Sequence, residues 1–205
     1  MKYVRHKGLG VRSQGKSLRP SHLTPHALRL TSSRRSQLIL VIGGASSGKS
    51  AAALDLAGKS AKRAFVATGE PLDEEMAEKI LRHRASRGGS WQTHEVPSDL
   101  VEWMKKHGQG YQSIVIDCLT LWLSNLLGRG LVGSRMYELV SDLLQAIRAT
   151  TALVVVVTNE LGLGLVPMDA SGRRFRDLVG QVNQQVAAEA DAVYFVLSGL
   201  PTRMK

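Results

Sequence analysis

The sequence predicts an α/β fold in which helices flank a mostly parallel sheet. From residue 37 onward, short apolar runs of strand length alternate with segments of helical periodicity, which is typical of parallel sheets covered by helices. The first run, residues 38–42, leads directly into a glycine-rich turn and then into an alanine-rich segment, residues 51–57. We therefore expect a strand, a tight loop and a helix at the start of a single folded domain.

The turn after this first strand carries the clearest functional signal. Residues 43–50 read G-G-A-S-S-G-K-S and match G-x-x-x-x-G-K-S, the pattern of a phosphate-binding loop. Its glycines let backbone N–H groups surround an anion, and the following helix adds the positive end of its dipole. The alternative is a glycine-rich turn with a surface lysine. We predict a P-loop NTPase-like (RecA-like) fold that binds a nucleoside triphosphate.

Each residue type of this loop has a chemical role in that prediction. Lys49 would place a charge on the outer phosphates, and Ser50 would offer its hydroxyl to Mg²⁺. The residues expected to contact the nucleotide are Gly43, Gly44, Ala45, Ser46, Ser47, Gly48, Lys49 and Ser50.

A second strand, residues 63–67, ends in small and polar residues. Ala67 is its last residue, and Thr68 and Gly69 follow it. Because parallel sheets bind ligands beyond the carboxyl ends of their strands, we expect these three residues to face the nucleotide.

An acidic residue follows a third strand, residues 111–116. Asp117 stands at the position usual for a Walker-B carboxylate, which holds Mg²⁺ in P-loop proteins. The alternative is that Asp117 is the N-cap of a helix over residues 119–127. We predict that Asp117 and Ser50 bind the metal together.

The remaining segments continue the alternation of helices and strands. Helices are expected over residues 71–87, from a Ser98 cap to about residue 107, from about residue 134 to 150, and over residues 173–190; strands are expected over residues 91–96, 152–157 and 191–197. The glycine-containing segment 161–171 is expected to be a mobile loop and a candidate lid.

The positive charge of the chain is concentrated at its N-terminus. The net charge is +10, but residues 1–36 hold nine Lys/Arg and no Asp/Glu, so residues 37–205 carry 18 − 17 = +1. We predict a flexible basic extension over residues 1–36, with an organelle transit peptide or a mis-assigned start codon as alternatives, and a nucleotide-binding domain over residues 37–205. The nearly neutral domain and its low aromatic content, 5%, lead us to expect no specific nucleic-acid partner.

The cysteine count and the hydropathy pattern restrict the cellular compartments that we expect for the protein. Cys118 is the one cysteine of the chain, so an intrachain disulfide is excluded and a reducing compartment is favoured. No apolar run reaches the length of a membrane span. We expect a cytoplasmic protein.

The ordered motifs of residues 38–205 resemble one family, the bifunctional adenosylcobinamide kinase / adenosylcobinamide-phosphate guanylyltransferases of cobalamin assembly. Besides the phosphate loop, the resemblance rests on A-T-G-E-P-L-D-E-E-M at 67–76, I-L-R-H-R-A-S-R at 80–87, W-Q-T-H-E at 91–95, V-T-N-E-L-G-L-G-L-V-P at 157–167 and R-F-R-D-L-V-G-Q-V-N-Q at 174–184. Each motif alone is weak, except the phosphate loop, but their order and spacing are specific.

The resemblance implies two reactions in one chain. A nucleoside triphosphate, GTP or ATP, first phosphorylates adenosylcobinamide, and GTP then transfers GMP to adenosylcobinamide phosphate through a histidine–GMP intermediate. The matching histidine here is His83, which without the resemblance reads as an ordinary surface histidine. The resemblance also implies a homotrimer. The further residues that it places at the GTP site are Thr68, Gly69, Arg84, Ala85, Ser86, Arg87, Glu95 and Asp117.

Two departures and two rival functions remain. Relatives commonly carry arginine where Ser46 stands, and they usually start at the first strand, so residues 1–36 inherit no role. The rivals are an unrelated P-loop small-molecule kinase, which needs no nucleophilic histidine, and a nucleic-acid-stimulated ATPase, which the basic extension would suggest.

Overall fold

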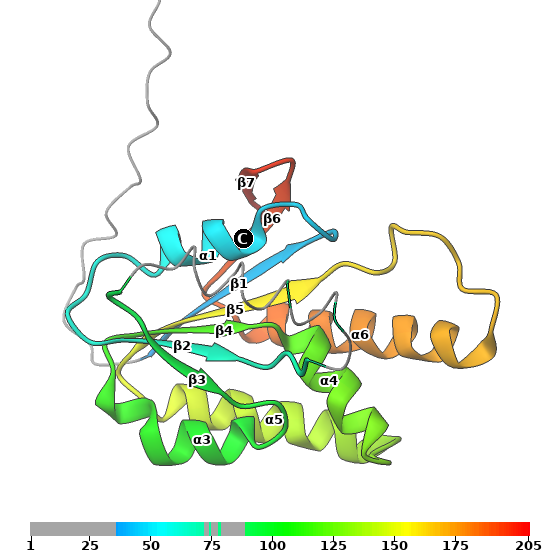
Figure 1. Ribbon diagram of the computed structural model, residues 1–205, viewed down its shortest axis with the longest axis horizontal. Helices are drawn as coiled ribbons and strands as arrows, with labels where there is room; N and C mark the ends of the chain where they lie inside the picture. Colours follow the sequence, from blue (N-terminus) through cyan, green and yellow to red (C-terminus); the bar gives the residue numbers. More distant parts are fainter. Residues whose placement is uncertain (1–35, 72–73, 75–77, 79–88) are drawn as a thin grey trace, which may run out of the picture. The chain divides into compact units, whose positions relative to one another are not determined.

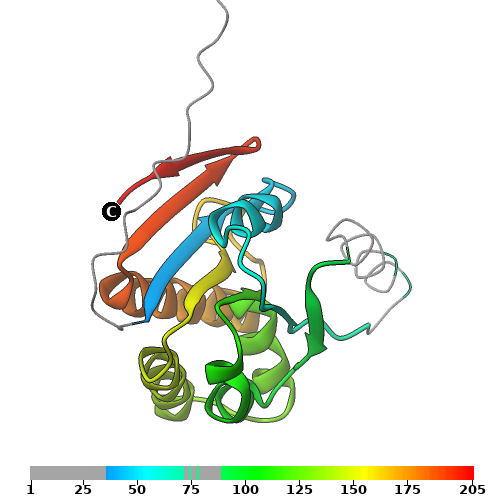
Figure 2. The same ribbon diagram turned by 90° about the vertical axis from the view of Figure 1, so that its left-hand side faces the viewer.

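The computed structural model describes residues 36–71, 74, 78 and 89–205, and its centre is a seven-stranded sheet (Figures 1 and 2). The order across the sheet is β3-β2-β4-β5-β1-β6-β7, with all neighbouring strands parallel except the last pair. The strands are β1 (Gln37–Gly43), β2 (Arg63–Ala67), β3 (Gln92–Glu95), β4 (Ser113–Asp117), β5 (Leu153–Asn159), β6 (Ala192–Leu197) and β7 (Leu200–Arg203). The predicted α/β fold class is confirmed.

The middle residues of the central strands form continuous apolar runs because both faces of the sheet are covered. The helices are α1 (Lys49–Leu56), α3 (Leu100–His107), α4 (Leu119–Gly128), α5 (Ser134–Arg148) and α6 (Ala170–Glu189), with a 3₁₀ turn, η1 (Gly108–Gly110), after α3. Helix α1 packs on one face, and α3, α4, α5 and α6 pack on the other (Figures 1 and 2). A strand buried on both sides loses the alternation of polar and apolar residues that a half-exposed strand shows.

Alternate residues of each central strand enter two different cores. In β5, Val154 and Val156 pack with the helices α3, α4, α5 and α6, whereas Val155 and Val157 pack with α1. The period of two that defines a strand therefore divides a continuous valine run between the two faces. The larger core also holds Trp122, which is fully buried and donates its indole N–H to the carbonyl oxygen of Ser98 at 2.7 Å.

Three predicted boundaries are corrected. The N-cap of α3 is Asp99 rather than Ser98, and no side-chain hydrogen bond caps the helix. Ser98 instead directs its hydroxyl to the Asp99 carboxylate at 3.2 Å and its carbonyl to Trp122. Ser36 belongs to the folded part rather than to the extension, because it is only 3% exposed and its carbonyl accepts a hydrogen bond from Arg148.

The third correction is the hairpin at the C-terminus. The chain does not end with the parallel strand β6 but turns through Ser198 and Gly199, which have φ angles of 50° and 80°, into the antiparallel strand β7. Two successive residues at positive φ suit a tight hairpin turn. All four residues of β7 are exposed. The segment therefore lacks the apolar periodicity from which a strand is predicted.

The described residues from 36 onward belong to one compact unit. No helix in the described part of the chain is long and apolar enough to span a membrane. Most of the predicted helix over residues 71–87 lies outside the described residues, although the backbone at Glu74 and Glu78 is helical.

Candidate nucleotide site

The predicted phosphate loop joins the carboxyl end of β1 to the start of α1, at the edge of the sheet where ligands bind in parallel folds (Figure 1). Its backbone needs glycine at two positions. A Cβ atom on Gly43 would lie 2.5 Å from the carbonyl oxygen of Val196, and Gly48 has a φ of 93°. A Cβ atom on Gly48 would also lie 3.1 Å from the Cα atom of Gly199. The loop is therefore a close-packed turn, held against the β6–β7 hairpin.

The lysine of the loop points back into it. The ammonium group of Lys49 donates a hydrogen bond to the carbonyl oxygen of Gly44, and the residue is 8% exposed. Burial lowers the pKa of Lys49, while the nearby Cys118 and Asp117 oppose that shift. A cation that has lost water and has few partners is well placed to bind a multivalent anion.

The loop serine and the acid of β4 are in direct contact. The hydroxyl of Ser50 donates a hydrogen bond of 2.7 Å to Oδ2 of Asp117, although the two residues come from α1 and β4. The helix-cap alternative for Asp117 is wrong, because Cys118 is the N-cap of α4 and no side chain caps that helix. Asp117 is instead the last residue of its strand, with its carboxylate directed at the loop.

The donor set fits a hard divalent cation. A serine hydroxyl and one carboxylate are oxygen ligands of the kind that Mg²⁺ takes together with phosphate oxygens and water. No cluster of three or more His, Cys, Asp or Glu side chains occurs among the residues that the structure describes. Ser50 and Asp117 are therefore the pair in this region that would hold Mg²⁺ beside a nucleotide.

The predicted residues at the end of β2 differ in what their side chains contact. Ala67 lies opposite both Glu95 of β3 and Asp117 of β4 in the register of the sheet, so the ends of the three strands form one row. Thr68 is different. Its side chain is fully buried, donates to the carbonyl oxygen of Cys118 at 2.7 Å and accepts from the amide of Cys118 at 2.8 Å. The Thr68 hydroxyl thus fixes the turn after β4, and the prediction that Thr68 and Gly69 face the nucleotide stays a prediction.

A buried polar network holds the carboxyl end of β5 between the strand of the phosphate loop and the strand of Asp117. The hydroxyls of Thr120 and Thr158 are 3.0 Å apart, and Thr158 donates to Asn183 at 2.8 Å. The amide of Asn159 donates to Thr120 at 2.8 Å, and Asn183 donates to the carbonyl oxygen of Asn159 at 3.1 Å. Our sequence interpretation gave Asn183 no role of its own, although it belongs to the motif at residues 174–184.

The amide of Glu160 connects this strand end to the phosphate loop. It donates a hydrogen bond of 3.0 Å to the carbonyl oxygen of Gly43. The loop that follows β5 therefore starts beside the predicted nucleotide site. His83, Arg84, Ala85, Ser86 and Arg87 lie outside the described residues, so their predicted roles stay predictions.

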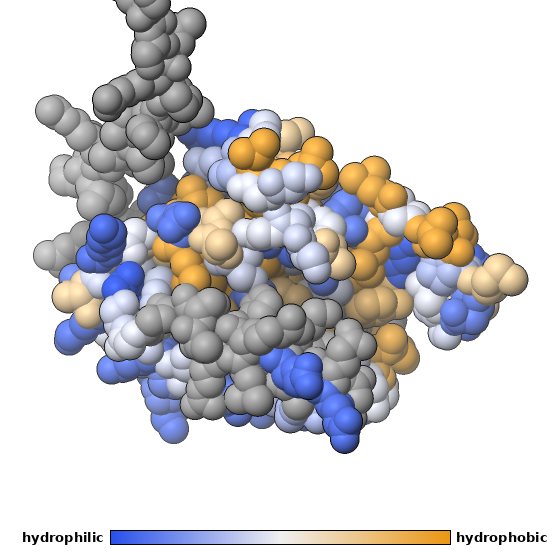
Figure 3. Space-filling model, turned by 45° about the horizontal axis from the view of Figure 1, so that its top comes forward, coloured by the Kyte–Doolittle hydropathy of each residue, from blue (hydrophilic) through white to orange (hydrophobic). Residues whose placement is uncertain are grey.

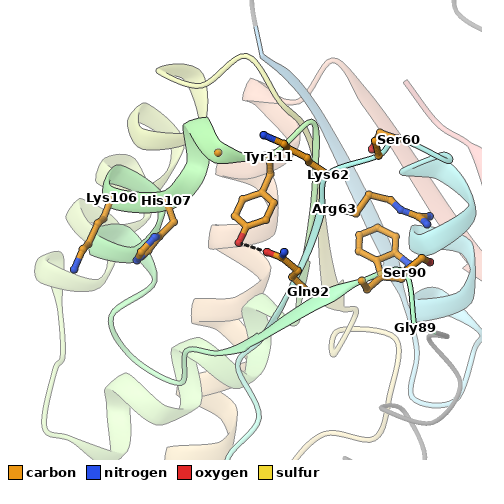
Figure 4. Close-up of a pocket in the computed structure, with 12 residues that line it drawn as sticks. Ser60, Lys62, Arg63, Gly89, Ser90, Gln92, Lys106, His107 and Tyr111 are labelled. Carbon is orange, nitrogen blue, oxygen red and sulfur yellow. Dashed lines mark hydrogen bonds between the residues drawn. The ribbon is translucent and has the colours of Figure 1, made fainter.

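A cavity of about 820 Å³ lies elsewhere, at the amino ends of β2, β3 and β4 (Figure 4). Arg63 stacks over the ring of Trp91 at 4.8 Å, and the hydroxyl of Tyr111 donates to Gln92 at 2.9 Å. Among the residues that the structure describes, none of those predicted for the nucleotide site lines this cavity. The cavity is therefore separate from the phosphate loop and Asp117.

The geometry of the loop, its lysine and Asp117 defines a P-loop NTPase fold. Residues 39–204 match the sequence model of the family described as cobinamide kinase / cobinamide phosphate guanyltransferase. The chain belongs to this family.

Curated relatives agree with the family match. The chain is 36% identical over 180 residues to the bifunctional adenosylcobalamin biosynthesis protein CobU of Escherichia coli, covering 82% of this chain and 99% of the relative. It is 36% identical over 171 residues to the corresponding protein CobP of Pseudomonas aeruginosa, covering 81% and 96%. The resemblance predicted from the sequence is confirmed, and it favours the bifunctional enzyme over the two rival functions.

Solved structures with related architecture are more distant. A KaiC-like protein from Pyrococcus horikoshii has 14% identity and a TM-score of 0.44, with 78% of this chain and 71% of that chain covered. The RadB recombinase has 17% identity and a TM-score of 0.46, with 78% and 73% covered.

Proposed function

We propose that this chain phosphorylates adenosylcobinamide and then transfers GMP from GTP to the phosphorylated product, giving adenosylcobinamide-GDP. The observation that carries the proposal is the contact between Ser50 and Asp117, because it joins the phosphate loop to an acid on another strand. Family membership supplies the chemical class of the acceptor.

The first reaction is a phosphoryl transfer that needs positioning and charge neutralisation. The acceptor hydroxyl attacks the γ-phosphorus, its proton leaves, and the bond to the β-phosphate oxygen breaks. Backbone amides of the loop bind the phosphates, and Lys49 neutralises the charge that develops on them. Ser50 and Asp117 would hold Mg²⁺, which would help to neutralise the same charge.

The second reaction needs a nucleophile, and we assign it to His83. A neutral imidazole nitrogen attacks the α-phosphorus of GTP and pyrophosphate leaves. A phosphate oxygen of the acceptor then attacks the same phosphorus, and the nitrogen–phosphorus bond breaks. The support for His83 is its place in the R-H-R-A-S-R segment, residues 82–87, which resembles the family motif and lies within the matched residues 39–204. The arginines on either side would neutralise the phosphate.

The nucleotides and the assembly complete the proposal. GTP serves the second reaction, and either ATP or GTP serves the first. Arg84, Ala85, Ser86, Arg87 and Glu95 contribute to the GTP site, as the family resemblance implies. The proposed assembly is a homotrimer.

The variant His83→Ala tests the proposal because it should separate the two reactions. Phosphoryl transfer needs no covalent protein step, so the variant should accumulate adenosylcobinamide phosphate while it loses protein-bound GMP. The measurement is acid-labile label on the protein after incubation with radiolabelled GTP, together with chromatography of the corrinoid products. His107→Ala, a change of the same chemistry at an exposed position of α3, is the control and should keep both activities.

Lys49→Ala is the complementary variant, since one phosphate loop serves both reactions in this proposal. It should reduce both turnovers at least about a hundred-fold, as expected when a group that stabilises transition-state charge is removed. Label that remains on the His83→Ala protein would overturn the histidine assignment. Near-normal turnover of Lys49→Ala in either reaction would overturn the shared site.

A further inference from the structure

Large apolar side chains are exposed on the loop that follows β5. Leu163, Leu165, Val166 and Met168 are 80%, 96%, 62% and 98% exposed. In Figure 3 an apolar surface covers this part of the molecule at the right-hand side of the view. We call residues 161–168 the apolar loop. Single exposed apolar residues are common on protein surfaces. Several of them in one short segment, as here, indicate a binding surface.

The apolar loop is fastened at both ends. At its start, the amide of Glu160 donates to the carbonyl oxygen of Gly43 in the phosphate loop. At its end, Asp169 caps α6 by accepting a hydrogen bond of 2.7 Å from the amide of Gly172. Arg173 of α6 donates to the carbonyl oxygens of Pro167 and Met168 at 3.0 and 2.7 Å. These contacts fix the backbone in a conformation that turns the apolar side chains outward.

The position of the apolar loop in the fold indicates the kind of ligand that it binds. It leaves the sheet directly beside the predicted nucleotide site and extends past the carboxyl edge to the start of α6 (Figure 1). A molecule that presents a hydroxyl to the γ-phosphate must approach across this edge. The loop carries no charged side chain between residues 161 and 168, so it suits an uncharged, apolar part of that molecule.

We propose that the apolar loop binds the methyl-bearing rim of the corrin ring of the cobinamide acceptor. This inference rests on the proposed function and names the residues that hold its acceptor. The corrin ring is a broad macrocycle with methyl groups on its periphery, too large to enter the phosphate loop. Leu165 and Met168, the two most exposed side chains of the loop, cover part of that rim while the hydroxyl of the side arm reaches the γ-phosphate.

The double variant Leu165→Ser/Met168→Ser tests the proposal. Both side chains are almost fully exposed, so their replacement leaves the cores intact. The dissociation constant for adenosylcobinamide, measured by equilibrium dialysis, should rise at least about ten-fold, since each apolar side chain that a ligand covers is worth roughly that factor. The KM for adenosylcobinamide should rise in parallel, and the dissociation constant for the nucleotide should stay unchanged.

A matched double variant serves as the control. Val132→Ser/Met204→Ser removes two other exposed apolar side chains, 65% and 68% exposed, from other parts of the surface, and it should bind adenosylcobinamide like the unchanged protein. Light scattering of all three proteins measures the mass of the assembly.

Three results would overturn the inference. One is unchanged binding of adenosylcobinamide to the loop variant, and another is equal weakening in the control. The third is a lower mass of the loop variant alone, which would make the loop a contact between copies of the chain. If the unchanged protein itself neither binds nor phosphorylates adenosylcobinamide, the proposed function fails, and the inference fails with it.

Discussion

The amide nitrogen of Gly199 donates a hydrogen bond of 2.8 Å to the carbonyl oxygen of Ser47, so the C-terminal hairpin is fastened to the phosphate loop. The two residues are far apart in the sequence, but β6 lies next to β1 in the sheet. The hairpin thereby supports the backbone of the phosphate loop. Gly48 packs against the same residue, since a Cβ atom there would lie 3.1 Å from the Cα of Gly199.

Gly48→Ala should weaken nucleotide binding without unfolding the protein. An alanine at a φ of 93° is strained, and its Cβ would press on Gly199, so the loop has to move. We expect the dissociation constant for GTP to rise about ten-fold or more, because a strain of 1–2 kcal/mol or more opposes the binding conformation. Isothermal titration calorimetry measures the change.

Gly180→Ala is the matched control for that experiment. Gly180 lies within α6, and a Cβ atom there has no neighbour within 4 Å. Alanine should stabilise the helix by about 0.5–1 kcal/mol and leave the GTP affinity unchanged. Unchanged affinity in Gly48→Ala would show that the contact with Gly199 does not set the shape of the loop.

Asp117→Asn should raise the Mg²⁺ concentration needed for half-maximal turnover in both reactions. The amide oxygen is a weaker ligand than the carboxylate, while the hydrogen bond from Ser50 can persist. Turnover is measured as a function of Mg²⁺ for both corrinoid products. Asp55→Asn, an exposed change on α1, should behave like the unchanged protein, and an unaltered Mg²⁺ requirement in Asp117→Asn would remove Asp117 from the metal site.

Cys118 should be unreactive in the folded protein at pH 8. Burial raises the pKa of its thiol to about 12, and the neighbouring Asp117 charge adds to this shift. Thiol reagents attack the thiolate, so a disulfide reagent should label the native chain slowly and should label one thiol per chain after denaturation. Rapid labelling of the native protein at this pH would contradict the assigned burial.

The raised pKa of Cys118 also predicts how the free energy of unfolding changes with pH. The folded state keeps the Cys118 proton up to about pH 12, whereas the unfolded chain releases it near its ordinary pKa of 9.0. The folded state therefore binds more protons above about pH 9, and the free energy of unfolding should fall as the pH rises through this range. Cys118→Ala should show a smaller fall between pH 8 and pH 10 in urea melts.

Asp191→Asn should destabilise the protein at neutral pH and have little effect in acid. Burial alone would raise the pKa of Asp191, but hydrogen bonds from Arg148 and the amide of Leu38, at 2.8 and 2.7 Å, outweigh it and lower the pKa below its ordinary value of 3.8. A lowered carboxyl pKa contributes stability above pH 4 that is lost as the pH falls further.

The melting temperature of Asp191→Asn should therefore be lower by a few degrees at pH 7, and this difference should shrink below pH 4. Asp142→Asn, a change of the same chemistry on α5, provides the comparison. A difference that is independent of pH would mean that the contact does not depend on the charge of Asp191.

Removal of residues 1–35 should leave the melting temperature and both reactions unchanged. The family match begins at residue 39, and the first strand begins at Gln37. The cut must precede Ser36, since its buried carbonyl accepts a hydrogen bond of 3.0 Å from Arg148. Thermal melts and both product assays on the shortened chain would reveal any contribution from the extension.

The sequence by itself determined the elements that depend on near neighbours. The valine run of β5, the glycines and lysine of the phosphate loop and the acid after β4 each follow from period, turn chemistry or motif within a few residues. The ordered motifs along residues 38–205 also determined the family. These signals depend on residues close together in the sequence, so they can be recognised without knowledge of the tertiary structure.

Tertiary structure alone decided which of these elements meet. The motifs predicted that Ser50 and Asp117 act together, but the support of the loop by Gly199 and the burial of Thr68 depend on the order of strands in the sheet. Periodicity identifies a strand but does not encode its neighbour, because any pair of apolar strands satisfies the same backbone hydrogen bonds. The strand β7 escaped prediction for a related reason: its residues are exposed, and what holds them is pairing with β6 rather than burial of an apolar face.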